Sequence, residues 1–135
     1  MLGAMQAITT VGVAESDMIS EPMAVLQGLD KITARVSEIE APVGKTVRFG
    51  SLSIIVRDCE RNPPEDRPES AAFLQIDERR PGEDSIRRFS GWMFAQSPAL
   101  SSLENPVYDV ILLDCKRASG SPPESSGSAS GNDAR

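Results

Sequence analysis

The sequence contains no histidine, and this absence excludes the Ser-His-Asp and Cys-His mechanisms that need an imidazole base. Walker-type and Rossmann glycine patterns are absent as well. A zinc site is disfavoured, because two cysteines without histidine leave the ion two ligands short unless carboxylates substitute. We therefore expect no catalytic residue, no metal and no cofactor. The sequence predicts that the protein is not an enzyme.

Carboxylate pairs of the kind that cleave glycosides are the catalytic device that the sequence leaves open, because such pairs meet only in the fold. The nearest candidates are Asp109 and Asp114, which lie in one apolar run. Their opposite parity along a strand places them on opposite faces, unless a bulge intervenes. We therefore expect that they do not form one site.

The chain also lacks a surplus of basic residues and any apolar run of 18 residues. Its formal net charge is −6, and residues 30–117 carry 13 Lys and Arg against 15 Asp and Glu. Nucleic acid requires a basic face, so we expect no nucleic-acid partner. We expect no membrane span either. The densest basic cluster contains interleaved acids, which favours a solvated hairpin over a phosphate site; it comprises Arg79, Arg80, Arg87 and Arg88.

Composition divides the chain into three parts. Residues 118–135 are Ser, Gly, Pro and Ala with almost nothing apolar to bury, and they predict a flexible tail. Residues 1–29 show no clean strand or helix period and are interpreted as a disordered leader. Residues 30–117 then form a single domain, because the chain is too short for two independent cores.

The first residues, MLGAMQAITTVGVAES, resemble the distal part of a signal peptide. The run is modestly apolar and ends in a small-x-small pattern, Gly12-Val13-Ala14, but no Lys or Arg precedes it. We favour a truncated or degenerate signal whose start is missing, which predicts an exported, periplasmic protein. The alternative is an ordinary leader.

Residues 30–117 alternate between apolar and polar residues in short runs, which predicts strands. The predicted fold is all-β, a small antiparallel sandwich or barrel of about six strands with one short helical turn and one disulfide. A Pro-Gly signal within residues 79–84 predicts an antiparallel hairpin, and Ser97 before Pro98 predicts an N-cap and one or two helical turns. The expected strands are residues 31–39, 43–49, 52–59, 70–77, 85–95 and 107–115.

The two cysteines occupy similar positions, because Cys59 and Cys115 each close an apolar run directly after an aspartate. If both runs are strands that end at the same rim, the two thiols come within disulfide range. Closing a loop of this length would stabilise the fold by roughly 4 kcal/mol.

Aromatic residues make up only 4% of the chain, and four of the six lie between Phe89 and Tyr108. The single tryptophan, Trp92, therefore has two competing interpretations. We favour burial in the core against Tyr108 or Val110, since a lone tryptophan in a small domain is usually buried. The alternative is a contact patch for a partner, which would comprise Trp92, Phe94, Ser97, Pro98, Leu100 and Tyr108.

Four blocks of the sequence resemble the bacterial family known as domain of unknown function 2155. They are LDKITARV, VGKTVRFGSLSIIVRDC, AAFLQID and FSGWMFAQSPALSSLENPVYDVILLDCK, and the resemblance spans roughly residues 29–116. The resemblance implies export in Gram-negative bacteria, and both cysteines fit the family pattern. The chain departs from the family in lacking a histidine near Asn105 and a second tryptophan near Ile111. Since the family has no assigned activity, no catalytic residue is carried over.

Two functions therefore compete at this stage. The first is a non-catalytic interaction module or accessory subunit with an envelope protein as its partner. The alternative is a small-ligand carrier, or a hydrolase without a known motif, that uses a cavity between the sheets.

Overall fold

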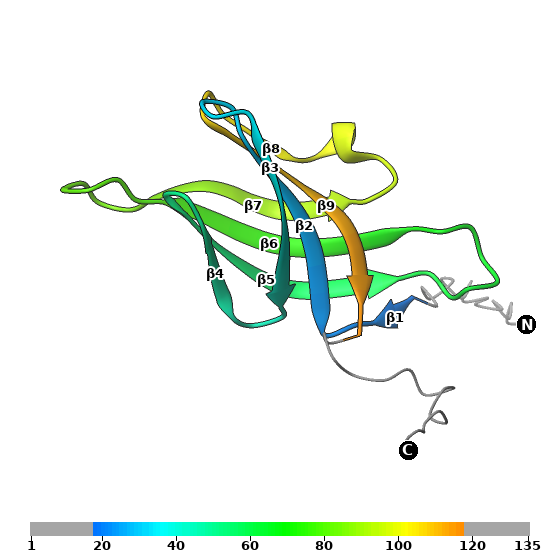
Figure 1. Cartoon of the computed structure of the whole chain (residues 1–135). Coiled ribbons are helices and arrows are strands. Elements are labelled where there is room, and N and C mark those ends of the chain that lie inside the picture. The colour runs from blue at the N-terminus through cyan, green and yellow to red at the C-terminus, as the bar shows by residue number, and fades with distance from the viewer. Residues whose placement is uncertain (1–17, 118–135) are drawn as a thin grey trace, which may run out of the picture.

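Strands occupy most of residues 18–117, the part of the chain that this computed structural model describes. They form two antiparallel sheets that face one another (Figure 1), so the predicted all-β sandwich is confirmed. The sheet that we call sheet A has the order β1-β5-β6-β7, and β4 also pairs with β5. Its strands are β1 (Ile19–Ser20), β4 (Thr46–Phe49), β5 (Leu52–Arg61), β6 (Ser70–Glu78) and β7 (Ile86–Phe94).

The second sheet, sheet B, has the order β3-β2-β9-β8. Its strands run across those of sheet A in Figure 1, as in sandwiches whose two sheets cross steeply. One 3-10 turn lies between β7 and β8, where a helical turn is predicted. The elements are β2 (Met23–Asp30), β3 (Arg35–Pro42), η1 (Pro98–Leu100), β8 (Leu103–Glu104) and β9 (Tyr108–Lys116).

The hydrophobic core fills the space between the sheets, and alternation along the strands supplies many of its side chains. On β6, Leu74 and Ile76 are fully buried, whereas the residues directly before them, Phe73 and Gln75, are partly exposed. Because successive side chains of a strand point to opposite faces, the first pair faces sheet B and the second pair lies on the outer face of sheet A. Fully buried members from other strands include Leu26, Leu52, Ile54, Met93, Val110 and Leu112.

The predicted hairpin is confirmed, since β6 pairs antiparallel with β7. The turn between them contains Gly82 with a φ of 77°, a left-handed conformation that glycine adopts without strain. The helical turn η1 is also confirmed, with Pro98 at its first position. Ser97 occupies the N-cap position as predicted, but its side chain makes no capping hydrogen bond. A turn this short leaves few free N–H groups for a cap to satisfy.

The predicted start of the domain at residue 30 is wrong. Strand β2 lies within the expected leader and pairs with both β3 and β9, so it is an inner strand of sheet B. Its first four residues, Met23 to Leu26, are all buried. A strand covered on both faces reads as a continuous apolar run without alternation, which explains why its sequence shows no period. The remaining leader, residues 1–17, and the predicted tail, residues 118–135, lie outside the described residues.

The expected strand over residues 31–39 also begins too early, since β3 starts at Arg35. Residues 31–34 form the turn between β2 and β3, in which the Asp30 carboxylate accepts hydrogen bonds from the backbone N–H of Ile32 (2.9 Å) and Thr33 (3.2 Å). Such an aspartate turn competes with the strand that alternation alone suggests. Strand β3 then continues through Ala41 and Pro42, where a break is predicted.

A close approach at one rim requires glycine. Gly50 has a φ of 60°, and a Cβ atom there would lie 2.1 Å from the Tyr108 hydroxyl oxygen. The same hydroxyl accepts a hydrogen bond from the backbone N–H of Ser51 (3.4 Å), and the Tyr108 ring stacks edge-on against Phe49 with ring centroids 5.2 Å apart. The β4–β5 turn of sheet A is thereby fixed against β9 of sheet B.

The predicted disulfide is confirmed. Cys59 on β5 and Cys115 on β9 are bonded, with their Cα atoms 5.6 Å apart. Since β5 belongs to sheet A and β9 to sheet B, the bond joins the two sheets covalently.

We predict that Cys59→Ser lowers the free energy of unfolding by about 2–5 kcal/mol, because the unfolded chain regains the freedom that the closed loop removes. Urea unfolding of the oxidised wild type, the reduced wild type and the variant measures this. Reduced wild type and variant should agree closely, and equal stability of all three would contradict the prediction.

Candidate functional site

The acidic pair considered from the sequence does not come together in the fold. No group of three or more His, Cys, Asp or Glu in this part of the chain is placed to hold a metal ion. Asp109 forms an ion pair with Lys31 (2.7 Å), and Asp114 accepts a hydrogen bond from the Ser70 hydroxyl (3.3 Å). Their partners on β2 are four residues apart, which separates the two carboxylates by about 13 Å along the sheet. Asp109 and Asp114 therefore do not act as a pair.

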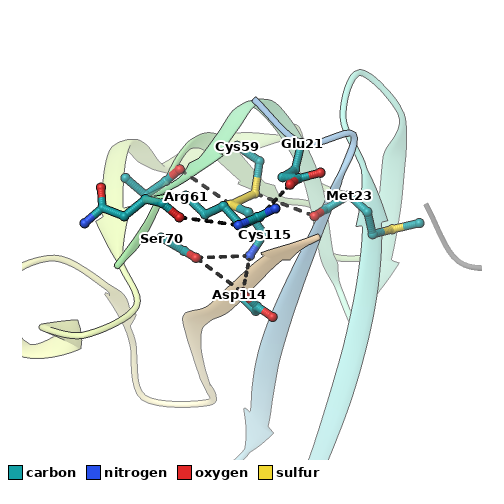
Figure 2. A network of polar contacts seen from close by, with 9 residues as sticks. Glu21, Met23, Cys59, Arg61, Ser70, Asp114 and Cys115 are labelled. Carbon is teal, nitrogen blue, oxygen red and sulfur yellow. Dashed lines mark hydrogen bonds and ion pairs between the residues drawn. A yellow bond between two sulfur atoms is a disulfide. The ribbon is translucent and has the colours of Figure 1, made fainter. Parts of the chain in front are cut away.

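Polar contacts close the region around the disulfide (Figure 2). The buried Glu21 carboxylate accepts a hydrogen bond from Arg61 Nε at 2.5 Å, and the Glu21 backbone N–H donates to the Cys59 carbonyl at 2.8 Å. Cys59 Sγ lies 3.7 Å from the carbonyl oxygen of Met23, a packing contact because a bonded sulfur carries no hydrogen. Both cysteines are 1% exposed. A disulfide so enclosed is structural, since a reductant must reach a sulfur atom to react.

A second buried carboxylate, Glu78, lies at the end of β6 that is remote from the disulfide. It accepts hydrogen bonds from Arg88 Nε (2.9 Å) and the Ser51 hydroxyl (3.0 Å), and Arg80 Nε lies 3.5 Å away. Burial raises the pKa of Glu78, but the hydrogen bonds and the two positive charges outweigh it and hold this pKa below 4.5. Arg87 pairs with Asp77. Three of the four clustered arginines therefore have acidic partners, as predicted.

Trp92 lies on the outer face of sheet A, so the predicted burial in the core is wrong. Its side chain is 39% exposed, and its ring packs edge-on against Phe73 of β6 with centroids 5.6 Å apart. The next residue, Met93, is fully buried and occupies the core position instead. The reason is parity, because Phe89 packs against the core and every second residue of β7 follows it inward. The size of tryptophan does not override that alternation.

The structure brings together only part of the predicted contact patch. Phe94 shares the outer face with Trp92 and lies opposite Ala71. Leu100 in η1, the turn beyond β7, is 76% exposed. Tyr108 does not belong to the patch, because it packs against Phe49 and Gly50 at another edge of the sandwich. The remaining predicted members, Ser97 and Pro98, are partly buried where the chain leaves β7.

Three neighbours of Trp92 were missed from the sequence. Phe73 lies directly opposite Trp92, and Asp58 of β5 lies opposite Phe73 on its other side. Glu60 lies two residues beyond Asp58, opposite Ala71. Phe73 could have been found from the sequence, because alternation along the strand places it on the face opposite to that of Leu74. The two acids had no such signal, because a bulge at Arg57 shifts the parity of β5.

The two acids on this face affect one another. Hydrogen bonding with Asp58, partial burial and the negative charge of Asp58 all raise the pKa of Glu60 above 4.5. Neither carboxylate forms an ion pair with a cation of residues 18–117, and the adjacent Arg57 donates its Nε–H to Gln75 Oε1 (3.2 Å) instead. The outer face of sheet A therefore combines exposed aromatic rings with negative charge that has no ion-pair partner.

Comparison with known proteins gives a family. The sequence model of the family described as "Uncharacterized protein conserved in bacteria (DUF2155)" matches residues 24–115. The chain is also similar to an uncharacterized protein, RP359, of Rickettsia prowazekii (strain Madrid E), with 33% identity over 87 residues. That alignment covers 64% of this chain and 56% of the Rickettsia protein, so the chain spans little more than half of its relative's length. No solved structure matches.

We predict that Glu78→Gln lowers stability by about 1–3 kcal/mol at pH 7, because Arg80 and Arg88 lose their charged partner. A carboxylate with a lowered pKa stabilises the fold above its unfolded pKa of 4.5, and this contribution disappears as the pH falls through the folded pKa. Urea unfolding between about pH 7 and pH 3 should therefore show the difference between wild type and variant shrinking. A difference that is independent of pH would contradict the ionic role of Glu78.

We predict that Trp92→Ala costs about 1–2 kcal/mol, because its edge-on contact with Phe73 contributes about 0.5–1.5 kcal/mol and the buried part of its ring adds to this. Met93→Ala, one residue further along the same strand, should cost about 2–5 kcal/mol because it leaves a cavity in the core. Chemical denaturation of both variants measures this contrast. A larger loss for Trp92→Ala than for Met93→Ala would return Trp92 to the core.

Proposed function

Because the chain belongs to the bacterial family of uncharacterized proteins DUF2155, we propose that it is an exported, non-catalytic interaction module of the cell envelope. In this proposal its domain is an accessory subunit that binds a protein partner through the outer face of sheet A. The observation that carries the proposal is the exposure of Trp92 beside Phe73 on that face. Tryptophan is enriched among the residues that contribute most to binding, and a large exposed aromatic residue is costly to keep in water.

Export is supported by the disulfide between Cys59 and Cys115. Disulfides persist in oxidising compartments and are rare in the cytosol, so the bond fits a location outside the cytoplasm. In a Gram-negative bacterium that location is the periplasm. No helix in the described part of the chain is long and apolar enough to cross a membrane.

A binding role, rather than catalysis, is supported by how the charged groups of residues 18–117 are used. The two buried carboxylates, Glu21 and Glu78, are each held by arginine and bridge parts of the fold. Asp109 and Asp114 are far apart along β9. Asp58 and Glu60, which form no ion pair within residues 18–117, stand beside the aromatic rings, where they serve recognition.

We predict that the full chain, used as bait in an envelope extract of the bacterium that encodes it, retains a stoichiometric protein partner. Trp92→Ala should lose that partner while remaining folded, because the ring supplies much of the contact area. A matched control is Val36→Ala, which removes a 62% exposed apolar side chain from β3 of sheet B and should keep the partner. Quantitative mass spectrometry of the eluates measures the molar ratio of partner to bait for the wild type and each variant.

Two results would contradict this function. Equal retention of the partner by wild type and folded Trp92→Ala would remove the outer face of sheet A from the interface. Co-purification of a small molecule with no protein partner would favour the carrier or hydrolase with a cavity between the sheets.

A further inference from the structure

Side chains on the outer face of sheet A lie in rows that cross three strands. One row contains Asp58 of β5, Phe73 of β6 and Trp92 of β7. Asp58 lies directly opposite Phe73 in the pairing of β5 with β6, and Phe73 lies directly opposite Trp92 in the pairing of β6 with β7. With strands about 4.8 Å apart, the row is about 10 Å long from Asp58 to Trp92. The aromatic pair therefore lies within reach of a side chain whose charged end contacts Asp58.

The adjacent row repeats the same order of chemistry. It contains Glu60 of β5, Ala71 of β6 and Phe94 of β7. Two residues along a strand span about 7 Å, so the two rows together form a face of about 10 by 7 Å. Its β5 side is acidic and its β7 side is aromatic. A face of this size fits one or two long side chains rather than a folded surface.

The acidic side is under electrostatic stress in the unbound protein. Asp58 and Glu60 point to the same face, and the pKa of Glu60 is raised by its contact with Asp58. The ion pairs within residues 18–117 involve other acids, and Arg57 donates a hydrogen bond to Gln75 instead. Like charges two residues apart on one face of a strand repel one another. A positive charge arriving from outside would relieve this repulsion.

The aromatic side attracts the same kind of group. Trp92 is 39% exposed and stands edge-on to Phe73, so the pair presents ring surface to solvent. The faces of aromatic rings are electron-rich and attract cations, tryptophan most strongly. Negative carboxylates and aromatic faces thus select one chemistry, a cation on a long apolar stem. Arginine and lysine side chains have this composition.

We propose that Asp58, Glu60, Phe73 and Trp92 form a binding site for arginine or lysine side chains on an extended, basic segment of the protein partner. The stem of the side chain lies on Trp92 and Phe73, and its charged end pairs with Asp58 and Glu60. This inference rests on the proposed function and identifies the chemistry of its partner. Charge complementarity carries it, because Asp58 and Glu60 form no ion pair within residues 18–117 and lie on the same face of the sheet as the aromatic rings.

The site has a built-in optical probe, because Trp92 is the single tryptophan of the chain. The test titrates the full-length protein with a blocked seven-residue peptide containing two arginines separated by serine, and follows tryptophan fluorescence. The expected result is a saturable change that weakens as salt screens the charges. Peptides with glutamate or serine in place of arginine should give no change. An equal response to all three peptides would overturn the inference.

Variants assign the response to the acids. Asp58→Asn combined with Glu60→Gln should weaken arginine-peptide binding by about tenfold or more, since the cation loses both ionic partners. The control double variant, Glu38→Gln with Glu104→Gln, changes the net charge equally on exposed residues of sheet B and should bind like wild type. If both double variants bind like wild type, or both lose binding equally, the site is overturned.

Thermal melting of the same variants separates binding from folding. Removing the repulsion between Asp58 and Glu60 should leave the melting temperature at pH 7 unchanged or higher. A clearly lower melting temperature would show that the two acids stabilise the fold and would overturn their assignment to a partner. A saturable fluorescence change with neutral tri-N-acetylchitotriose, and none with the arginine peptide, would overturn the inference and indicate that the site binds a glycan.

The two proposals fail in different ways. If Trp92→Ala loses the envelope partner but the arginine peptide never binds, the interaction module stands and its basic partner is overturned. If folded Trp92→Ala keeps the partner, the proposed function fails at this face whatever the peptide does.

Discussion

The disulfide between Cys59 and Cys115 depends on a β-bulge in each of the strands that carry it. On β5, Leu52, Ile54 and Val56 face the core, so simple alternation would next turn residue 58 inward. The register shifts between Val56 and Asp58, and Cys59 faces the core instead. The two sheets can be bonded only because the chain departs from alternation directly before each cysteine.

Strand β9 repeats this arrangement. Val110 and Leu112 are buried, the pairing with β2 then shifts, and Cys115 rather than Asp114 is buried. Bulges also bend a strand and increase its twist, which suits two sheets whose strands cross. The covalent link and the crossing of the sheets therefore have the same local origin. Each of these bulges also leaves an aspartate directly before the cysteine, Asp58 in β5 and Asp114 in β9.

Sequence patterns predicted the parts of this structure that depend on local chemistry. The hairpin of β6 and β7 follows from its Pro-Gly turn, and the disulfide from two apolar runs that end alike. Strand β2 was missed because the first half of the strand is buried on both of its faces, which removes the alternation that identifies a strand. Trp92 was misplaced because its size was given more weight than its parity with Met93. Asp58 was missed because a bulge cannot be read from spacing.

The outer face of sheet A brings aromatic rings together with acids that form no ion pair within residues 18–117. Ion pairs elsewhere in this part of the chain use other acids, as where Lys31 pairs with Asp109 and Lys116 pairs with Glu40. On sheet A, the bulge at Arg57 places Asp58 beside the aromatic pair, and no cation of residues 18–117 forms an ion pair with it. The shift that lets Cys59 reach its partner thus also positions the carboxylate that we assign to recognition. A variant that removed the bulge would be expected to lose the disulfide and the acidic half of the site together, since both depend on the same extra residue.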